Sequence, residues 1–424
     1  MLRPAACVAI AAAAIAVYAA SAGYGLFADD FQWLVAAQQF QPSRLVDLGD
    51  RAHFYRPVIE VYFPSAFAVC GRDASCYHWL NILLHAATSL LVTGMAAALA
   101  RHFWTGAFAG LLFAIQPGPM EAVIWVSAVT EVLSTAFFVL AVWLFVRALE
   151  TGARLSYAGA FVSAVACHLT HESGLMLLPV LAVLVWLHRG PDSAVVRRHL
   201  MMLAPFSVIT TAVAATAVVV NSRNYVVTDG EYGIGWHMLR NELDAVATFT
   251  IASHDAVGLI FAAVLIAFAL VAGPPRVRFY GLWIIATLLP FSGFREGFSS
   301  RYLYLAAAGF AALGAELFWW LRQSLAHKSR YGLALWWVAV VVLTARFAVF
   351  ANKNVRTWDD AGAPYSQYGA RVRGLYPSAT PGMTLDVPPP PKEISPHYLP
   401  AFLQWEYGDI SLRIRARGEA PAVD

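Results

Sequence analysis

The sequence predicts an all-α protein that crosses a membrane many times. Of its 424 residues, 59% are hydrophobic and only 13% are charged, about half the charged share of a soluble domain. The mean hydropathy is +0.59, and long apolar stretches recur along the chain. The net charge of +3 and the absence of a basic run in the sequence give no indication of a nucleic-acid partner.

We expect about eleven transmembrane helices. Apolar stretches of roughly 18–25 residues match the thickness of a bilayer when they are helical. The third and sixth expected helices are short. The expected helices cover residues 5–27, 79–100, 103–116, 131–149, 155–171, 174–188, 200–220, 247–272, 279–293, 302–322 and 331–350.

The Lys and Arg residues predict the orientation of these helices, because cytoplasmic loops carry an excess of both. Alternate turns carry such residues, and all of these turns fall on the side of the N-terminus. They are Arg3, Arg101, Arg147, Arg154, Arg189, Arg197, Arg198, Arg276, Arg278, Arg322, Lys328 and Arg330. We therefore expect the N-terminus in the cytoplasm, and the first loop and the C-terminal tail outside it.

The first apolar segment allows two interpretations. Arg3, the apolar run and the Ala-rich positions near 19–22 fit a cleavable signal peptide. The many later spans favour an uncleaved signal anchor, which is what we expect.

Four cysteines are present. Cys7 and Cys167 lie in apolar segments, where packing roles are expected. Cys70 and Cys76 lie in the first outer loop, where an oxidising compartment allows a disulfide; the alternative is two free thiols. Neither their number nor their surroundings suit a zinc site.

Two outer segments are too long to be simple connections. The first outer loop, 28–78, contains aromatic, amphipathic stretches that suit helices lying in the membrane interface. The tail, 351–424, is richer in Pro and charge, and its residues 402–415 alternate enough to predict a strand or hairpin. We expect a membrane domain over 1–350 and a small outer appendage over 351–424.

The pair Asp29-Asp30 directly follows the first apolar segment. Two adjacent carboxylates are costly in hydrocarbon and are therefore expected just outside it. Other polar residues gather on the same side, namely Arg56, Glu60, His78, Glu121, Glu131, His171, Glu172, Arg295, Glu296 and Arg301. Carboxylates and arginines on one membrane face suit a reaction with a phosphate-bearing lipid, in which an Asp acts as general base and arginines hold the leaving phosphate.

These residues also have purely structural interpretations. Asp29 and Asp30 can cap the helix that follows them. Glu121 and Glu131 can be solvated loop charges, although apolar sequence surrounds both. Arg301 precedes aromatic residues and can anchor the chain at the membrane interface.

His78, Asn81 and His85 share one face of an expected helix because they are three and four residues apart. Such a stripe is either a hydrogen-bonding seam between helices or a set of ligands. Of the two, the seam is the commoner use of such a pattern.

Six stretches, taken together, resemble a known family. The chain looks like the GT-C class of integral-membrane glycosyltransferases, and in particular like bacterial relatives of the protein O-mannosyltransferases and of the transmembrane-and-tetratricopeptide O-mannosyltransferases. The similarity covers about residues 20–360. Its stretches are Asp29-Asp30-Phe31, the Tyr-Arg-Pro segment 54–58, the Tyr-His-x-x-Asn-x-x-x-His segment 77–85, the Pro-x-x-x-Glu-Ala-Val-x-Trp block 116–127, the Arg-Tyr-Leu-Tyr-Leu block 300–305 and residues 354–358.

The chain also departs from that pattern. Gln116 and Pro119 replace two histidines, Ser300 replaces a Glu, and His171-Glu172 stands where Lys-Glu is usual. The tetratricopeptide repeats that often follow the last helix are absent from this sequence. The missing histidines leave open whether sugar and acceptor match those of the nearest relatives.

The resemblance implies a GT-C-like bundle that uses a polyprenyl-phosphate-linked sugar outside the cytoplasm. It implies that Asp29 is the catalytic base and that Asp30 assists it or helps to bind a divalent cation such as Mg or Mn. It places Glu121 and Glu131 near the sugar or the acceptor. The substrate-binding candidates are Arg56, His78, Glu121, Glu131, His171, Glu172, Arg295 and Arg301.

The leading hypothesis is a glycosyltransferase of the bacterial inner (plasma) membrane that transfers a sugar to a hydroxyl of a glycan, lipid or protein. One alternative is a transporter or flippase for lipid-linked sugars, which predicts inverted repeats or charges near the bilayer midplane. The sequence contains no detectable repeats, and its polar residues gather on the outer face. Another alternative is a non-catalytic relative that acts as an assembly partner.

Overall fold

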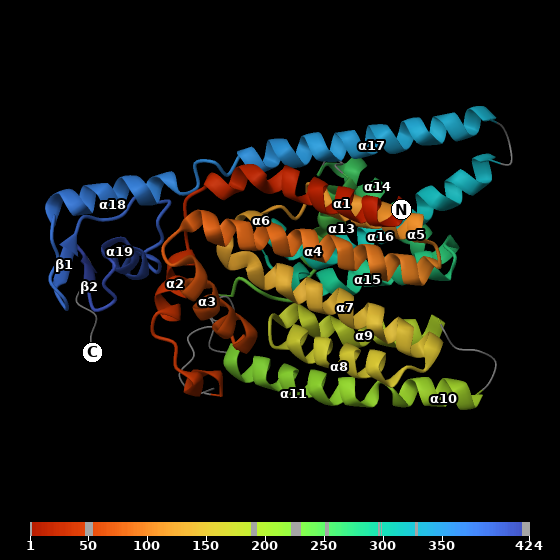
Figure 1. Cartoon of the computed structure of the whole chain (residues 1–424), viewed down its shortest axis with the longest axis horizontal. Coiled ribbons are helices and arrows are strands. Elements are labelled where there is room, and N and C mark those ends of the chain that lie inside the picture. Colours follow the sequence, from red (N-terminus) through yellow and green to blue (C-terminus); the bar gives the residue numbers. More distant parts are fainter. Residues whose placement is uncertain are drawn as a thin grey trace.

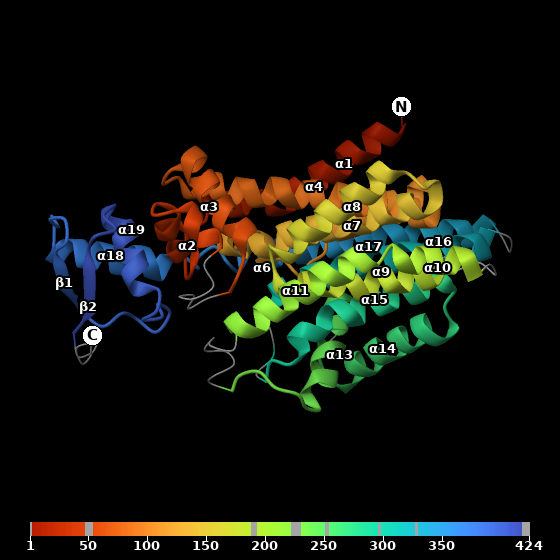
Figure 2. The same cartoon turned by 90° about the horizontal axis from the view of Figure 1, so that it is seen from below.

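The computed structural model describes residues 2–46, 54–187, 193–221, 230–250, 254–295, 297, 299–326 and 330–417. The molecule is an elongated bundle of helices with a small unit at one end (Figures 1 and 2). The helices of the bundle run along the long axis. The N-terminus lies toward the end of the bundle that is far from this unit.

The N-terminal half supplies the first layer of the bundle and the first outer loop. Its elements are α1 (Leu2–Tyr18), η1 (Ala19–Gly23), α2 (Asp30–Ala37), η2 (Pro42–Leu45), α3 (Pro57–Cys70), α4 (Ala74–Ala100), α5 (Phe103–Ala114), α6 (Glu121–Ile124), η3 (Val126–Ala128), α7 (Val129–Thr151), α8 (Arg154–His168), η4 (Glu172–Met176), α9 (Leu177–Leu187), α10 (Ser193–Met201) and α11 (Ala204–Asn221).

The C-terminal half completes the bundle and forms the terminal unit. Its elements are α13 (His237–Thr250), α14 (Ala256–Ala267), the π-helix η5 (Phe268–Ala272), α15 (Pro275–Ser292), η6 (Ser300–Leu303), α16 (Tyr304–Ala326), α17 (Arg330–Arg356), α18 (Ala363–Leu375), β1 (Thr384–Val387), α19 (Leu399–Tyr407) and β2 (Arg413–Ala416).

Six helical stretches of the described residues are long and apolar enough to cross a membrane. They are Leu2–Gly23, Ala74–Ala100, Val126–Thr151, Val195–Val220, Ser300–Leu325 and Tyr331–Arg356. The other five expected segments contain shorter or more polar helices, so a count of eleven stays a prediction. The expected span 247–272 is wrong at its start, because residues 247–250 belong to the amphipathic helix α13 and the apolar helix begins only at Ala256.

Small residues let α4 and α5 approach closely. A Cβ atom added to Gly110 would lie 1.9 Å from Thr93 Oγ1, and one added to Gly106 would lie 2.4 Å from the Thr93 carbonyl oxygen. Helices in membranes associate through such close contacts, since lipid gives them little hydrophobic drive to do so. Helix α4 also packs against α1 and α7, and is therefore central to the first layer.

The expected polar stripe on α4 is a seam between helices. Asn81 Nδ2 donates to the Trp125 carbonyl (3.1 Å), and His85 bridges the Tyr304 hydroxyl (2.7 Å) and the Ala114 carbonyl (3.1 Å). His85 Nε2 must donate to this carbonyl, so Nδ1 accepts from Tyr304. These bonds tie α4 to the chain around α6 and to α16.

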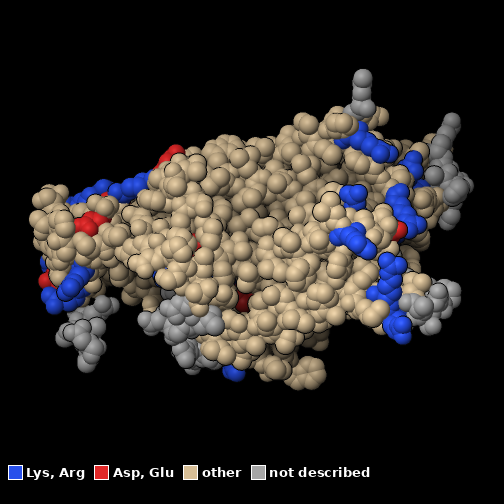
Figure 3. Space-filling model, turned by 60° about the horizontal axis from the view of Figure 1, so that its bottom comes forward, with Lys and Arg blue, Asp and Glu red and all other residues tan. Residues whose placement is uncertain are grey.

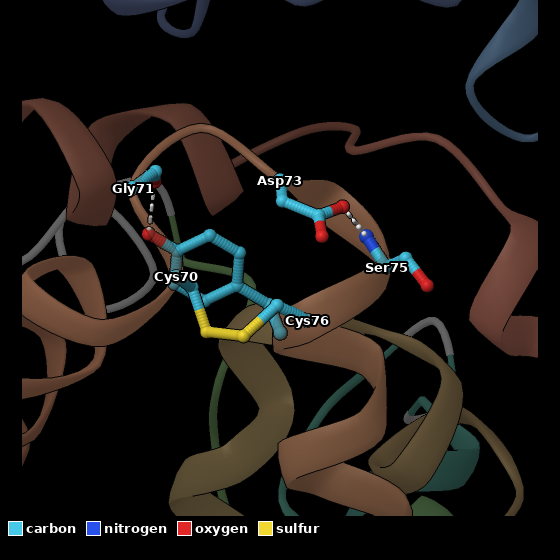
Figure 4. Close-up of a disulfide and its surroundings, with 6 residues drawn as sticks. Cys70, Gly71, Asp73, Ser75 and Cys76 are labelled. Carbon is cyan, nitrogen blue, oxygen red and sulfur yellow. Dashed lines mark hydrogen bonds between the residues drawn. A yellow bond between two sulfur atoms is a disulfide. The ribbon is translucent and has the colours of Figure 1, made fainter.

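A disulfide joins Cys70 and Cys76 across the turn between α3 and α4 (Figure 4). Asp73 caps α4 by accepting from the Ser75 N–H (3.0 Å), and the Tyr77 hydroxyl donates to the Gly71 carbonyl (2.6 Å). The sequence left the oxidation state of this pair open, and the structure places both sulfurs in one bond.

The terminal unit shares a hydrophobic core with the first outer loop. Phe31 of α2 packs against Tyr365 of α18 and Phe402 of α19, with ring centroids 5.3 and 5.0 Å apart. Strands β1 and β2 pair in parallel, Thr384 with Arg413 through Val387 with Ala416. The predicted strand over 402–415 is wrong for its first half, which is helical in α19, because the apolar residues there face this shared core.

Lys and Arg gather at the end of the bundle that is far from the terminal unit (Figure 3). Between this end and the unit lies a broad surface with few charges in that view. Arg101 pairs with Glu150 at this end (3.1 Å). Lys and Arg also lie on the terminal unit in this view, so the expected orientation stays a prediction.

The disulfide gives a direct prediction. Denatured but unreduced protein should take up two equivalents of maleimide, on Cys7 and Cys167, and reduced protein should take up four. Intact mass spectrometry measures the difference. The double variant Cys70→Ser/Cys76→Ser should take up two under both conditions; four reactive thiols in the unreduced parent protein would contradict the bond.

Candidate functional site

The two carboxylates at the start of α2 have different surroundings. Asp30 is completely buried, and its two oxygens accept the backbone N–H groups of Ser127 (2.8 Å) and Phe27 (3.1 Å). Asp29 is partly exposed, and its Oδ1 accepts from the Ser127 hydroxyl (2.5 Å). Asp30 therefore fastens α2 to η3, whereas Asp29 faces a cavity.

Burial raises the pKa of both carboxyl groups. It raises the pKa of Asp29, while the Ser127 hydrogen bond and the charges of Arg301 and Arg56 oppose the rise. Burial also raises the pKa of Asp30 well above its usual value, and the adjacent Asp29 charge raises it further. A carboxylate with a raised pKa accepts a proton more readily, which suits Asp29 to a general-base role.

A buried carboxylate holds Arg301 in place. Glu121, at the start of α6, is 5% exposed and pairs with the Arg301 guanidinium (2.5 Å). The hydroxyls of Ser299 and Ser300 and the Arg301 N–H also donate to its two oxygens. These bonds align α6 with η6, so Glu121 lies behind Arg301 and not on the cavity wall.

Aromatic rings complete the surroundings of Arg301. Its guanidinium carbon lies 4.5 Å from the ring centroid of Trp125 and 4.7 Å from that of Tyr302. The Tyr302 ring stacks on Phe291, with centroids 4.4 Å apart. The contacts with the Trp125 and Tyr302 rings and with Glu121 fix the orientation of the guanidinium.

A second polar cluster joins the start of α3 to η4 and α7. Arg56 donates to Glu172 through Nε (3.1 Å) and Nη2 (2.7 Å). His171 Nε2 lies 3.0 Å from Glu131 Oε1 and 3.6 Å from Glu172 Oε2. These four side chains therefore form one connected cluster.

The His171 ring has a defined tautomer. The Ser173 N–H donates to Nδ1 (3.2 Å), so the proton of the neutral ring is on Nε2, toward Glu131. Burial lowers the pKa of His171 well below its usual value, and the charges of Arg56 and Arg301 lower it further. His171 is accordingly neutral at physiological pH.

The cavity in front of these groups has a volume of about 1210 Å³. It lies between the bundle and the terminal unit, and both contribute to its wall. Charged or titratable side chains on the wall include Asp29, Arg44, Arg56, Glu60, Glu131, His171, Glu172, Glu231, Arg301 and His397. One cavity thus brings together most of the polar residues that the sequence singled out.

Four of the predicted site residues lie off this wall. Asp30 and Glu121 are buried behind it, where they position Asp29 and Arg301. His78 is fully buried in α4 beside Tyr24, with ring centroids 6.5 Å apart. Arg295 is exposed, outside the cavity lining. Glu296, also noted in the sequence, lies outside the described residues.

The side-chain oxygen and nitrogen atoms near Asp30 do not form a ligand set for a divalent cation. Such ions need several ligand atoms that converge on one point. Both oxygens of Asp30 are bonded to backbone N–H groups. Among the residues that the structure describes, no group of three or more His, Cys, Asp or Glu side chains could hold a metal ion.

Sequence reasoning missed several wall residues. Ser127 and Trp125 lie in the 116–127 block, but no role was predicted for either. In the folded chain the Ser127 hydroxyl donates to Asp29, and the Trp125 ring lies under Arg301. His397, Tyr398 and Gln404 come from the terminal unit. No local signal in the tail marks these three, because only the shared core brings them to the cavity.

Comparison with known proteins gives partial matches in sequence. No protein-family model matches the chain. It is 33% identical over 135 residues to protein O-mannosyl-transferase TMTC2 of Mus musculus, a match that spans 30% of this chain and 16% of the relative. It is 27% identical over 166 residues to protein O-mannosyl-transferase F38B6.6 of Caenorhabditis elegans, over 38% of this chain and 23% of that protein. The chain thus matches only a small part of each relative's length.

Solved structures match over nearly the whole chain. The archaeal oligosaccharyltransferase AglB from Archaeoglobus fulgidus, in complex with an inhibitory peptide and a dolichol-phosphate, superposes with a TM-score of 0.60 at 11% identity, over 97% of this chain and 64% of AglB. ArnT from Cupriavidus metallidurans, bound to undecaprenyl phosphate, gives 0.59 at 15% identity, over 97% and 86%. Identities this low establish the fold alone. The chain thus resembles protein O-mannosyl-transferases in part of its sequence and shares the fold of AglB and ArnT.

Proposed function

We propose that this protein is a glycosyltransferase that moves a sugar from a polyprenyl-phosphate donor to an acceptor hydroxyl. The observation that carries the proposal is that one cavity is lined by Asp29, Arg301 and Arg56 together. The partial similarity to O-mannosyl-transferases and the fold shared with ArnT and AglB support the same class of reaction.

The chemistry follows from the positions of these groups. Asp29 accepts the proton of the acceptor hydroxyl while the acceptor oxygen forms a bond to the anomeric carbon of the sugar. The bond between that carbon and the phosphate oxygen breaks, and its electron pair leaves with the phosphate. Arg301, with Arg56 near it, stabilises the charge that develops there. Direct displacement inverts the configuration at the anomeric carbon.

The neighbouring residues prepare this arrangement. Glu121 and the two rings fix Arg301, and Asp30 fixes the start of α2, so neither side chain needs to reorganise when charge develops. Glu131 and His171 line the same cavity and can accept from or donate to sugar hydroxyls. The stacked rings of Phe291 and Tyr302 supply an apolar wall.

We further propose that the reaction takes place outside the cytoplasm of a bacterial inner membrane. The cavity lies at the end of the bundle opposite the main gathering of Lys and Arg in Figure 3, and cytoplasmic loops carry such an excess. The disulfide between Cys70 and Cys76 lies at the end of α3, a helix that contributes Phe63 to the cavity lining. Disulfides are typical of an oxidising compartment. By this orientation the terminal unit also lies outside.

The central variant is Asp29→Asn. It keeps the shape of the side chain but cannot act as base, so transfer should fall by at least about 10². A deletion strain complemented with the variant is compared with its parent by mass spectrometry of lipids and glycans. The glycan lost on deletion should return with the parent gene and with Asp360→Asn, an exposed control. Its return with Asp29→Asn, at equal protein abundance, would refute the base assignment.

A second variant tests how the Ser127 hydrogen bond affects the pKa of Asp29. The Ser127 hydrogen bond stabilises the carboxylate form, so Ser127→Ala should raise the pKa of Asp29 further. The base acts only when ionised, and activity is lost as pH falls through its pKa. The acid limb of the pH–rate profile should therefore move to higher pH. Ser366→Ala, an exposed change in α18, should leave it in place; an unmoved limb in Ser127→Ala would argue against Asp29 as the titrating group.

A further inference from the structure

A second cavity lies at the opposite end of the bundle. It has a volume of about 900 Å³ and forms where η5 meets α15 and where the start of α5 lies beside the last turns of α16. It shares no lining residue with the cavity around Asp29. Its polar and aromatic lining includes His102, Arg276, Arg278, Glu316, Trp319 and Trp320. This is the end where Lys and Arg gather in Figure 3.

Two arginines of this cavity are held by the protein. The Arg276 Nε atom lies 3.4 Å from Glu316 Oε1, and its Nη1 donates to the Leu99 carbonyl (3.1 Å). Arg278 donates to the carbonyls of Gly273 (2.8 Å) and Val271 (3.0 Å). A guanidinium has five N–H donors, more than these contacts use. Both side chains are therefore oriented and retain donors for an anion.

The backbone turn before α15 creates this geometry. A Cβ atom on Gly273 would lie 2.5 Å from the Ala269 carbonyl oxygen and from Val277 Cγ1, so only glycine fits. The tight turn directs two carbonyl groups toward the Arg278 side chain. Short π-helices such as η5 occur frequently at functional sites.

A third arginine, Arg322, lies beside Trp319 but outside the lining of the cavity. The Arg322 guanidinium carbon lies 4.8 Å from the ring centroid of Trp319 and 5.9 Å from that of Trp336. Burial lowers the pKa of His102, and the charges of Arg322 and Arg3 lower it further, so the imidazole is neutral. The cavity lining thus contains two arginines, Arg276 and Arg278, and one carboxylate, Glu316, and has net positive charge.

The rim of the cavity is apolar. Phe268 and Trp320 line it and are 40% and 56% exposed, and Val271 beside them is 76% exposed. In a protein that spans a bilayer, such side chains at the ends of helices contact lipid. A ligand from the membrane would thus meet acyl-chain contacts first and the arginines at headgroup depth.

We propose that this cavity binds the phosphate headgroup of an anionic phospholipid of the surrounding leaflet. Arginine forks match phosphate oxygens, and basic pockets between membrane helices suit such headgroups. Trp319 and Trp320 line the cavity, and tryptophan is enriched at the boundary between headgroups and acyl chains. This site is independent of glycosyl transfer, so either proposal can fail without the other.

Native mass spectrometry of the full chain in detergent tests the proposal. The protein is mixed with equal amounts of phosphatidylglycerol and phosphatidylcholine, and it should retain phosphatidylglycerol preferentially. Arg278→Gln should reduce this retention by about fivefold. Arg147→Gln removes an exposed arginine near the end of α7, on the same side of the bundle, and should leave retention unchanged.

Arg278 also supports the turn before α15, so Arg322→Gln serves as a second variant. The Arg322 guanidinium lies over the rings of Trp319 and Trp336, beside the cavity wall. It should reduce retention in the same direction. Equal retention of the two lipids, or equal losses in Arg322→Gln and Arg147→Gln, would overturn the proposal. So would a thermal stabilisation by inorganic phosphate as large as that by phosphatidylglycerol, because the ligand would then be free phosphate.

Discussion

The geometry of the proposed active site depends on one buried carboxylate. Asp30 accepts two backbone N–H groups, from Phe27 before α2 and from Ser127 in η3, far apart in the sequence. Without these acceptors, each buried N–H would cost about 1–3 kcal/mol. The same bonds set the distance between the Asp29 carboxylate and the Ser127 hydroxyl. The two members of the acidic pair thus have different roles: Asp30 binds the backbone, and Asp29 lines the cavity.

Glu121 does for Arg301 what Asp30 does for Asp29. The Glu121 carboxylate accepts hydrogen bonds from Ser300 and Arg301. It thereby fixes the Arg301 guanidinium, which also lies over the rings of Trp125 and Tyr302. Asp29 and Arg301, which line one cavity, are thereby each held in place by a carboxylate outside its lining. Preorganisation of this kind stabilises developing charge because the protein need not rearrange.

Much of the architecture was predictable because it rests on local composition. The apolar stretches predicted helices, and the arginines predicted a basic end of the bundle. The spacing of His78, Asn81 and His85 allowed a seam or a ligand set, and Asn81 and His85 form a seam. Long-range packing decided the rest. The sequence around 402–415 alternates like a strand, yet its first half is the helix α19, because Phe402 packs with Phe31 and Tyr365. Likewise, polarity alone could not separate Arg301, which lines the cavity, from Arg295, which is exposed.

The central claim is that donor phosphate binds between Arg301 and Arg56 with its reacting carbon toward Asp29. The most direct measurement is an experimental structure of the protein in a lipid nanodisc with undecaprenyl phosphate, the lipid bound in the ArnT structure. The account predicts phosphate density within hydrogen-bond distance of the Arg301 guanidinium, inside the cavity that Asp29 lines. Phosphate density outside that cavity, with Arg301 still paired only to Glu121, would contradict it.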